Sequence, residues 1–450
     1  MGRLFGTDGV RGVANVELTA DLAFRLGQAG AYVLAGEKQH TPKILVGKDT
    51  RLSCDMLEAA LTAGICSVGA EVISLGIIPT PAVAYLTRLY NADAGVVISA
   101  SHNPFEFNGI KFINSQGYKL SDEIEEKIES IILDGSVKIS PCEPDKIGRR
   151  TVCDTALTDY VDFAKSTINT DLKGLRILVD CANGASYRTA PETLRQLGAE
   201  VRVINDSPDG KNINAGCGST HMAQIQGIIA EEGKYDIGLA FDGDADRVLA
   251  VDENGCLVDG DQIMTIIGLD LKEQNKLKDD TIVVTVMSNM GFDIMARREN
   301  INIVKTAVGD RYVLEKMLEN GYVLGGEQSG HVILLEHNTT GDGLITALQL
   351  LAVLKKTGRK LSELASQMQV LPQVLLNARV TNENKKKIKE DSYIQELCRQ
   401  IEEEMNGEGR ILIRPSGTEP LVRVMLEGKD PDYIADKAAE LVRIIEERLS

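Results

Sequence analysis

One order of strand-forming and helix-forming segments recurs three times along this chain. In the first round, Ile44–Arg51 is an apolar run that ends in a Gly/Asp turn, and Val/Ile-rich runs follow at Glu71–Leu75 and Ala94–Ile98. Short β-branched runs bounded by Gly and Asn, with helical patterns between them, predict α/β layers with buried, largely parallel strands. The same order returns with strand-forming segments in 176–184, 200–204 and 235–241, and again in 281–291, 301–305 and 322–331. Such self-similarity predicts three related domains.

The pattern changes after Leu371. Val374–Val380 predicts a strand, Gly409–Leu426 holds two more, and Tyr433–Leu449 is an amphipathic helix, while the Lys-rich stretch Asn382–Asp391 is expected to be solvated. Within the first round, Ser53 is expected to cap a helix, and 186–197 is expected to form a helix in the second round. The predicted fold class is therefore α/β, with three related domains of mixed, largely parallel sheets and a smaller C-terminal α+β domain. The expected domains are 1–152, 153–254, 255–370 and 371–450, with a hinge near residue 370.

Composition narrows the class of protein. A chain of 450 residues is long enough for several domains, each with its own core. The net charge of −17 argues against nucleic acid and anionic membranes as partners. Eight cysteines without a Cys-x-x-Cys pair, no leader-like N-terminus and no long apolar run predict a cytoplasmic protein. Several cations nevertheless lie in or beside Gly-rich loops and predict a locally positive cleft: Arg11, Lys48, Arg51, Lys111, Arg247, Arg311, Arg414 and Arg423.

Each repeat ends its third strand in a polar string. These strings are Gly95–Pro104, Gly238–Arg247 and Gly325–His331. In open α/β sheets ligands bind beyond the carboxyl ends of the strands, so three related domains can direct three such loops at one cleft.

The second string carries three carboxylates. Asp242, Asp244 and Asp246 alternate along the chain and can direct oxygens at one hard cation. An EF-hand is excluded because its sixth place needs Gly and here holds Arg247, and because the strand-like run Val248–Val251 follows. Mg²⁺ is therefore favoured over Ca²⁺, with an Asp/Gly turn that caps a strand as the structural alternative.

The first string supplies a candidate nucleophile. Ser101 lies at the tip of a predicted strand, and Ser99, two residues earlier, is the competing candidate. A phosphorylated serine is a good phosphoryl donor when a metal and cations neutralise the transferring oxygens. His102 and Lys111 follow closely and are candidates for moving the proton, with Lys111 the better candidate for general acid/base work.

The remaining strings fit a sugar and a phosphate. Glu327 and Ser329 suit vicinal hydroxyls or an amine, and the turn at 309–311 is a weaker signal of the same kind. In the C-terminal region Arg414, Ser416, Gly417 and Thr418 can present a guanidinium, hydroxyls and N–H groups to a phosphate, with Arg423 as a second cation. Nucleophile, metal, sugar grip and phosphate anchor together predict a phosphotransferase that acts on phosphosugars.

Five strings in this order resemble the signature set of the α-D-phosphohexomutase superfamily, over the whole chain. They are Phe5–Gly12, Ser99–Pro104, Asp242–Arg247, Gly326–His331 and Arg414–Pro420. Phe5–Gly12, Met287–Gly291 and Gln328 are most similar to the bacterial members that act on glucosamine phosphates.

The resemblance implies four domains in a heart-shaped arrangement around a central cleft, and a set of roles. Ser101 would be the phosphoserine, and with Asp242, Asp244 and Asp246 it would bind one Mg²⁺ per chain. Lys111, His102 and Arg11 would assist the transfer. Substrate contacts would come from Glu327, Ser329, His331, Gly309, Asp310, Arg247, Lys48 and Arg51, and the non-reacting phosphate would be held by Arg414, Ser416, Gly417, Thr418 and Arg423.

The implied reaction interconverts glucosamine 6-phosphate and glucosamine 1-phosphate and supplies UDP-N-acetylglucosamine and cell-wall precursors. Phospho-Ser101 would give its phosphoryl group to the sugar, and the resulting glucosamine 1,6-bisphosphate would return its other phosphate. A phosphosugar is the expected partner, and a homodimer is compatible with the pattern. The alternatives are a phosphomannomutase/phosphoglucomutase of the same superfamily, an aspartyl-nucleophile phosphotransferase that uses Asp242 and Asp244, and a noncatalytic sugar-phosphate sensor.

Overall fold

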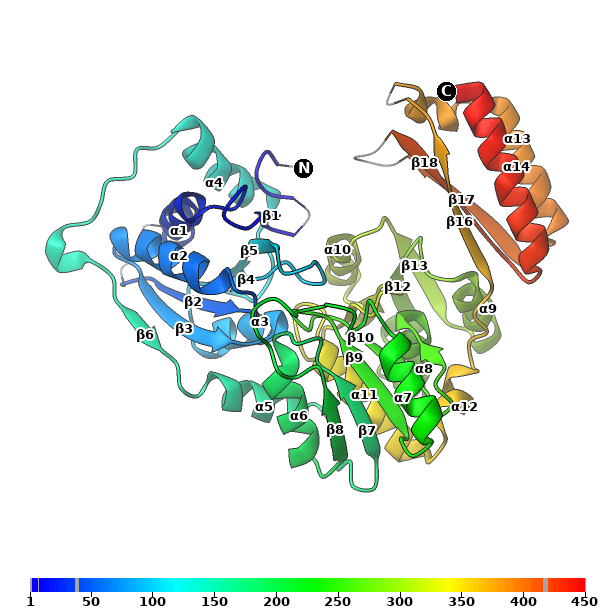
Figure 1. Cartoon of the computed structure of the whole chain (residues 1–450), viewed down its shortest axis with the longest axis horizontal. Coiled ribbons are helices and arrows are strands. Elements are labelled where there is room, and N and C mark those ends of the chain that lie inside the picture. The colour runs from blue at the N-terminus through cyan, green and yellow to red at the C-terminus, as the bar shows by residue number, and fades with distance from the viewer. Residues whose placement is uncertain (1, 7, 37–39, 382, 416–419, 450) are drawn as a thin grey trace. The chain divides into compact units, whose positions relative to one another are not determined.

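The computed structural model describes residues 2–6, 8–36, 40–381, 383–415 and 420–449 (Figure 1). Its internal contacts divide the chain into two compact units. The first comprises residues 1–287 and 301–367, and the second comprises residues 288–300 and 368–450. The longer segment of the second unit begins at residue 368, close to the hinge expected near residue 370. Its shorter segment, 288–300, comes from the range that was expected to form the third domain.

The first sheet has six strands in the order β1-β5-β4-β2-β3-β6. β2, β3, β4 and β6 are parallel, whereas β5 is antiparallel to both β4 and β1. A buried apolar cluster joins one face of this sheet to α1, α2 and α4. α3 packs on the opposite face, where a Cβ on Gly47 would lie 2.5 Å from Val83. The elements are β1 (Val10–Val13), α1 (Ala20–Ala35), β2 (Lys43–Lys48), α2 (Cys54–Ser67), β3 (Glu71–Ile77), α3 (Thr80–Leu89), β4 (Ala94–Ile98), β5 (Phe107–Asn114), α4 (Asp122–Asp134) and β6 (Arg150–Val152).

The next two sheets repeat this plan. The second has the order β11-β10-β9-β7-β8 and the third the order β13-β12-β14-β15. The second sheet and its helices are α5 (Ala156–Ser166), β7 (Arg176–Asp180), α6 (Ser186–Gln196), β8 (Glu200–Ile204), α7 (Ala223–Glu232), β9 (Ile237–Phe241), β10 (Val248–Val251) and β11 (Leu257–Val258). The third set is α8 (Gly260–Glu273), β12 (Thr281–Thr285), α9 (Met290–Glu299), β13 (Asn302–Thr306), α10 (Asp310–Asn320), β14 (Leu324–Gly326), β15 (Val332–Leu334), α11 (Gly343–Thr357) and α12 (Leu361–Ala365), with α9 in the second unit.

Strand pairing confirms the threefold repeat. In each sheet the first strand of the round lies between the second and the third, and both are parallel to it. A fourth strand then pairs antiparallel with the third. The turn after the first strand is also built alike, because a side-chain oxygen accepts the N–H two residues ahead: Asp49 from Arg51, Asp180 from Ala182 and Thr285 from Met287. The expected α/β class with largely parallel strands is thus observed.

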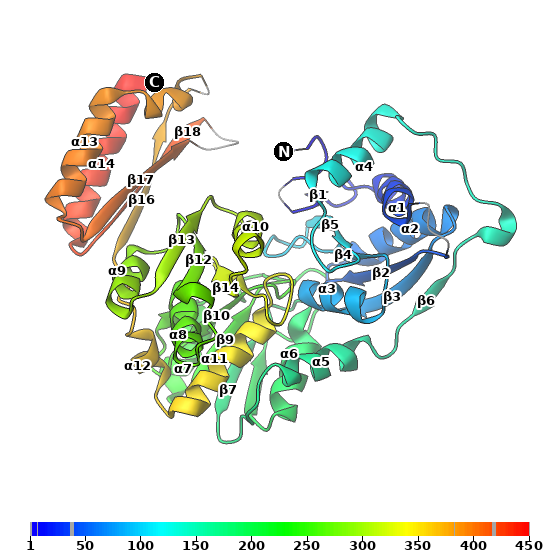
Figure 2. The ribbon, with the colours of Figure 1, turned by 180° about the vertical axis from the view of Figure 1, so that it is seen from behind.

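The C-terminal part is α+β, as expected. Its antiparallel sheet has the order β16-β18-β17, and Figures 1 and 2 both show α13 and α14 side by side along one face. Ile434, Ala438, Leu441 and Ile445 recur at helical spacing and are buried against that sheet, so α14 is amphipathic as predicted. The elements are β16 (Gln373–Arg379), α13 (Ser392–Glu404), β17 (Gly409–Pro415), β18 (Leu421–Gly428) and α14 (Pro431–Leu449).

Two local expectations differ from the structure. α2 does begin after Ser53, but the Ser53 side chain makes no capping hydrogen bond, because the Ser53 backbone is helical (φ −74°, ψ −12°) and not extended; its Oγ accepts the Asn108 amide. The Lys-rich stretch is not wholly solvated, because it contains a short 3₁₀ helix at Asn384–Lys389 whose Ile388 is buried in the C-terminal core. Among the described residues no helix combines the length and the apolar character that a bilayer span requires.

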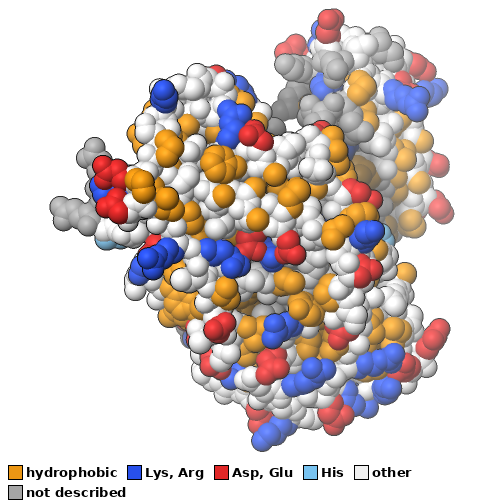
Figure 3. All heavy atoms as spheres, turned by 60° about the vertical axis from the view of Figure 1, so that its left-hand side comes forward, with side chains coloured by type: hydrophobic (Ala, Val, Ile, Leu, Met, Phe, Trp, Pro, Cys, Tyr) orange, Lys and Arg blue, Asp and Glu red, His pale blue; other side chains and the backbone are white. Residues whose placement is uncertain are grey.

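Acidic and basic side chains are interspersed on the face shown in Figure 3. The net charge of −17 is therefore not gathered into one acidic patch on that face.

Candidate active site

Ser101 lies three residues beyond the end of β4 and is almost fully buried. Its Oγ donates a hydrogen bond of 2.8 Å to Asp242 Oδ2 and lies 3.4 Å from His102 Nδ1. The Ser101 backbone has φ +52°, a left-handed conformation that costs a non-glycine residue about 1–2 kcal/mol. Ser99, the competing candidate, is also buried, but its hydroxyl donates to Asp49 Oδ2 at 2.6 Å and accepts the Ser101 N–H at 3.0 Å. Ser99 therefore supports the loop, whereas Ser101 presents its hydroxyl to the carboxylates.

The three carboxylates that follow β9 converge. One oxygen from each of Asp242, Asp244 and Asp246 lies within 4.8 Å of the other two, and all three residues are buried. Burial and the two neighbouring carboxylates raise the pKa of Asp242 well above its usual value. Asp244 Oδ1 and Asp246 Oδ1 are buried and have no hydrogen-bond partner among the described residues. Concentrated charge and unpartnered carboxylate oxygens fit a hard divalent cation such as Mg²⁺, which prefers oxygen ligands.

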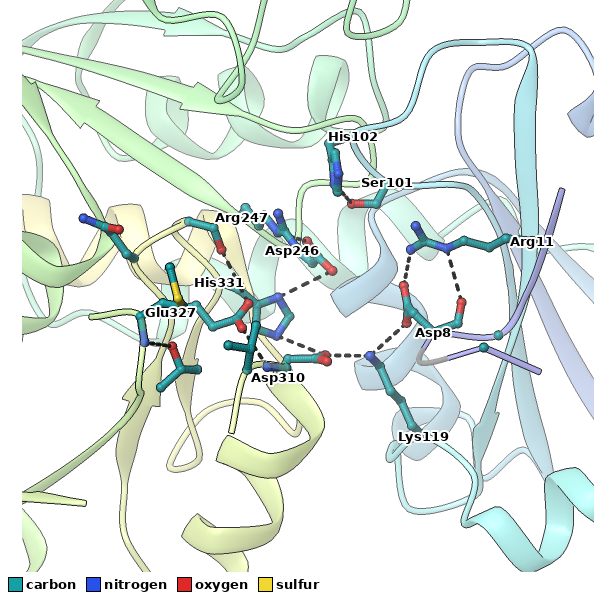
Figure 4. Close-up of a pocket in the computed structure, with 18 of the residues that line it drawn as sticks. Asp8, Arg11, Ser101, His102, Lys119, Asp246, Arg247, Asp310, Glu327 and His331 are labelled. Atoms are coloured by element: carbon teal, nitrogen blue, oxygen red, sulfur yellow. Dashed lines mark hydrogen bonds and ion pairs between the residues drawn. The ribbon is translucent and has the colours of Figure 1, made fainter. Parts of the chain in front are cut away.

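Ion pairs connect this cluster to Asp8, Lys119 and Asp310, and Figure 4 shows these last three side chains. Lys111 Nζ lies 2.8 Å from both Asp244 Oδ2 and Asp8 Oδ2. Lys119 Nζ then joins Asp8 Oδ1 at 2.8 Å to Asp310 Oδ2 at 2.5 Å. Burial alone would lower the pKa of Lys111, but Asp244 and Asp8 outweigh it and raise this pKa above its usual value. The geometry thus favours a fixed positive charge at Lys111 over the predicted general acid/base role.

The two histidines of the site differ in their surroundings. His331 is buried between two carboxylates, with Nδ1 3.5 Å from Asp246 Oδ2 and Nε2 3.6 Å from Asp310 Oδ2. Although burial lowers the pKa of His331, these carboxylates raise it to about 9. Burial lowers the pKa of His102, and the nearby Arg247 and Arg11 guanidinium groups lower it further. His102 is therefore neutral at pH 7 and is the better placed of the two to accept the Ser101 proton.

The third loop follows β14. Glu327 Oε1 accepts the Gly309 N–H at 3.2 Å, and Ser329 Oγ lies 3.5 Å from Glu327 Oε2. Gln328 is one of the residues most similar to family members that act on glucosamine phosphates. Its Nε2 donates a hydrogen bond of 3.0 Å to Asp259 Oδ2. Asp259 caps the N-terminus of α8, so Gln328 also anchors the loop to that helix.

These loops line one cavity of about 690 Å³ within the first unit (Figure 4). Its wall includes half of the predicted site residues, namely Arg11, Ser101, His102, Asp246, Arg247, Gly309, Asp310, Glu327, Ser329 and His331. Asp242, Asp244 and Lys111 do not line the cavity, but Asp242 accepts the hydrogen bond of Ser101 and Lys111 pairs with Asp8. The sequence analysis missed Asp8 and Lys119, which also line the cavity. Asp8 lies inside the Gly-rich string Phe5–Gly12 and could have been found from it, whereas no motif marks Lys119.

Two predicted substrate contacts lie elsewhere. Lys48 Nζ bonds Asp55 and Glu58 of α2, at 2.5 and 2.6 Å, and does not line the cavity. It shares a face of β2 with Ile44 and Val46, which pack toward α2. Arg51 is buried, pairs with Asp49 at 3.0 Å and donates to backbone carbonyls of the serine loop. In this structure both side chains support other parts of the first repeat, and a substrate contact from either stays a prediction.

The predicted phosphate cradle belongs to the second unit. Arg414 on β17 is in register with Arg423 on β18, so adjacent antiparallel strands place both side chains on one face. Ser416, Gly417 and Thr418 lie outside the described residues.

Comparison with known proteins identifies relatives over the whole chain. Four models of the phosphoglucomutase/phosphomannomutase family match: α/β/α domain I at residues 2–137, domain II at 158–255, domain III at 259–371 and the C-terminal domain at 375–444. The chain is 71% identical over 449 residues to a phosphoglucosamine mutase of Acetivibrio thermocellus and 67% identical over 450 residues to one of Ruminiclostridium cellulolyticum, with 100% of each chain covered in both cases.

Solved structures share the fold. A phosphoglucomutase/phosphomannomutase family protein from Burkholderia thailandensis aligns with a TM-score of 0.81 at 24% identity, covering 99% of this chain and 97% of that one. An Aspergillus fumigatus N-acetylphosphoglucosamine mutase in complex with GlcNAc-6P and magnesium aligns with a TM-score of 0.65 at 17% identity, covering 99% and 96%.

Proposed function

The chain belongs to the phosphoglucomutase/phosphomannomutase family, and we propose that it interconverts glucosamine 6-phosphate and glucosamine 1-phosphate, a step toward UDP-N-acetylglucosamine and cell-wall precursors. One observation carries the chemistry: Ser101 lines the cavity, and its hydroxyl donates a hydrogen bond to Asp242. The choice of glucosamine rests on the full-length relatives, because several share more than half of all residues with this chain and carry that activity in their names.

The proposed transfer is balanced at Ser101. Phospho-Ser101 gives its phosphoryl group to a sugar hydroxyl: the bond between phosphorus and Oγ breaks and a bond between phosphorus and the sugar oxygen forms. The sugar hydroxyl loses its proton and the departing Oγ takes one up, so that Ser101 ends as a hydroxyl. The glucosamine 1,6-bisphosphate so formed turns over and returns its other phosphate to Ser101 by the reverse step. We assign His102, with Nδ1 3.4 Å from Oγ, to the proton on Ser101 Oγ: the neutral imidazole accepts it when Ser101 attacks the bisphosphate and returns it to Oγ in the opposite step.

The chain's own charges prepare the site for this transfer. Mg²⁺ held by Asp242, Asp244, Asp246 and the Ser101 phosphate would supply positive charge next to the transferring oxygens. Lys111 keeps Asp244 oriented through its 2.8 Å ion pair. Arg11 and Arg247 line the cavity and are placed to meet phosphate oxygens.

We assign the sugar to the third loop and its neighbours. Glu327, Ser329 and His331 would hold hydroxyl and amino groups, with Gly309 and Asp310 beside them. The non-reacting phosphate is assigned to Arg414, Ser416, Gly417, Thr418 and Arg423. We place the reaction in the cytoplasm, because all eight cysteines are free thiols. A homodimer and the four domain boundaries stay predictions from the sequence.

The serine route is favoured over an aspartyl nucleophile by position. A nucleophile must reach the substrate, and of Ser101 and Asp242 only Ser101 lines the cavity. Ser101→Ala tests this choice. Purified protein with Mg²⁺, glucosamine 1-phosphate and a trace of the 1,6-bisphosphate is followed by ³¹P NMR, with the exposed Ser115→Ala as the matched control.

We expect Ser101→Ala to lose essentially all mutase activity and the control to keep it. Mass spectrometry of the active wild type should find phosphate on Ser101. A Ser101→Ala enzyme of normal activity would refute the serine route and support the aspartyl alternative. Ratios of kcat/KM for glucosamine, glucose and mannose phosphates then test the sugar, and a preference for glucose or mannose would refute the proposed substrate.

A further inference from the structure

The backbone on both sides of Ser101 is held by buried polar groups. On the amino side, the Ser101 N–H donates to Ser99 Oγ, which itself donates to Asp49. On the carbonyl side, Ser101 O accepts two hydrogen bonds, from Arg51 at 2.8 Å and from Asn214 Nδ2 at 2.9 Å. Because Ser101 has φ +52°, this loop needs such support to keep its conformation.

Asn214 reaches this loop from the second repeat. It lies between β8 and α7, and its side-chain amide donates to Ser101 O and also to Asn103 O at 3.1 Å. Its own backbone N–H donates to Ala182 O at 2.9 Å, and the nearby Gly218 N–H donates to Asp180 at 2.8 Å. The Asn214 amide is therefore presented from a loop that is itself fixed to the end of β7.

The direction of the amide is determined by its surroundings. Both contacts of Nδ2 are to carbonyl oxygens, so the opposite assignment of the amide would place an oxygen against two oxygens. Asn214 Oδ1 is buried and makes no hydrogen bond in the part of the chain that the structure describes. Among the described residues, the Asn214 side chain therefore makes its hydrogen bonds through Nδ2 alone, and both go to carbonyls of the Ser101 loop.

We propose that Asn214 is a positioning residue for the phosphoryl transfer. By holding the Ser101 and Asn103 carbonyls, it fixes the left-handed conformation that directs Ser101 Oγ at Asp242 and the cavity. Arg51 holds the same carbonyls from the first repeat, so the two residues fix the loop from both domains. This inference rests on the proposed function, because it assigns Asn214 a part in the reaction of Ser101.

Two variants test the amide without disturbing the backbone of Asn214, which has φ +58°. Asn214→Gly removes the side chain and tolerates a left-handed conformation. Asn214→Asp keeps the shape but turns an oxygen toward two carbonyl oxygens. Asn275→Gly is the matched control, since Asn275 is also left-handed (φ +56°) but exposed just after α8.

Misplacement of a reacting group by about 1 Å can cost about 100-fold in rate. We expect a fall in kcat of about 100-fold in Asn214→Asp, which repels both carbonyls, and of about 10-fold in Asn214→Gly, which only removes the support. KM should change less than threefold in both. The rate at which the 1,6-bisphosphate phosphorylates Ser101, followed by mass spectrometry, should fall by the same factors. The ³¹P resonance of phosphoserine should shift in both variants and coincide with the wild type in Asn275→Gly. Circular dichroism and thermal unfolding check that the variants are folded at the assay temperature.

Wild-type kcat and an unshifted ³¹P resonance in folded Asn214→Gly and Asn214→Asp would overturn the role of Asn214. A loss confined to stability, with kcat per folded molecule unchanged, would overturn it as well. If the wild type itself neither turns over substrate nor carries phosphoserine, it is the proposed function that fails. The two failures are therefore distinguishable within one set of measurements.

Discussion

Gly243 lies between Asp242 and Asp244 in the loop 242–246 after β9, which is called the metal loop below because it carries the three carboxylates. We predict that even alanine cannot replace Gly243 without loss of activity. A Cβ at this position would lie 2.5 Å from Ser101 O, 2.8 Å from Asn214 Nδ2 and 2.9 Å from Ile213 Cδ1. Ordinary van der Waals contact begins near 3.4 Å, so the serine loop and the metal loop would have to separate by about 0.9 Å. A displacement of about 1 Å between reacting groups costs roughly 100-fold in rate, which is about 2.7 kcal/mol in the activation free energy.

The expected result for Gly243→Ala is therefore a kcat about 100-fold below the wild type. The free energy of unfolding should fall by about 1–3 kcal/mol, because the added methyl overpacks a buried site. Urea unfolding and a ³¹P mutase assay measure the two quantities. Gly227→Ala is the matched control: it lies inside α7 with nothing within 4 Å of the added Cβ, so it should keep full activity and gain about 0.5–1 kcal/mol of stability. Wild-type kcat in Gly243→Ala would refute the argument that the two loops are in contact through their backbones.

Three further results are expected. Relative to the protein in EDTA, Mg²⁺ at 100 times its Kd should raise the free energy of unfolding by about 2.7 kcal/mol. Asp242→Asn should remove most of this rise. Equal melting temperatures with and without Mg²⁺ would contradict the proposed metal site. Arg51→Met should cost about 3–5 kcal/mol in urea unfolding, because it leaves Asp49 buried without its cation, whereas Arg176→Met, which breaks an exposed pair, should cost less than about 1 kcal/mol. Burial raises the pKa of Glu129, but hydrogen bonds from the Phe5, Arg3 and Leu4 N–H groups outweigh it and lower that pKa. The contribution of Glu129 to the free energy of unfolding is therefore present at neutral pH and is lost as the pH falls below about 4.5. Glu129→Gln should be less stable than the wild type at pH 7, and the difference in stability should narrow at pH 3.5.

The sequence was most informative where strand ends and motifs coincide. Ser101, Asp246 and Glu327 each follow the third strand of a repeat, and the parallel pairing of those strands brings their loops to one cavity. The order of strands within each sheet followed from the repeated pattern of β-branched runs. Residue type and position along the chain were sufficient here, because the carboxyl ends of parallel strands are where loops meet.

The direction in which a side chain points was harder to predict from the sequence. Lys48 and Arg51 are cations beside a Gly-rich turn, and composition alone could not separate a phosphate ligand from a structural ion pair. Lys48 alternates onto the face of β2 that α2 covers, so Glu58 captures it. Lys119 shows the converse case, because its place between Asp8 and Asp310 depends on the packing of the first repeat against the third and leaves no local pattern.

The assembly of the three loops depends on backbone contacts, which explains why a motif search finds the chemistry and misses the packing. The metal loop is held from the first repeat by the Thr80 N–H, which donates to Asp244 O at 3.0 Å, and from the third by the Gly343 N–H, which donates to Ala245 O at 3.1 Å. Because main-chain atoms make these contacts, Asp244 Oδ1 and Asp246 Oδ1 accept no hydrogen bond from the described residues and stay available for a cation. The residues that such docking constrains are those with no room for a Cβ or with positive φ, such as Gly243, Ala245 and Ser101. A substitution that alters the backbone there should therefore impair phosphoryl transfer as strongly as the loss of a charged group, even though it removes no reacting atom.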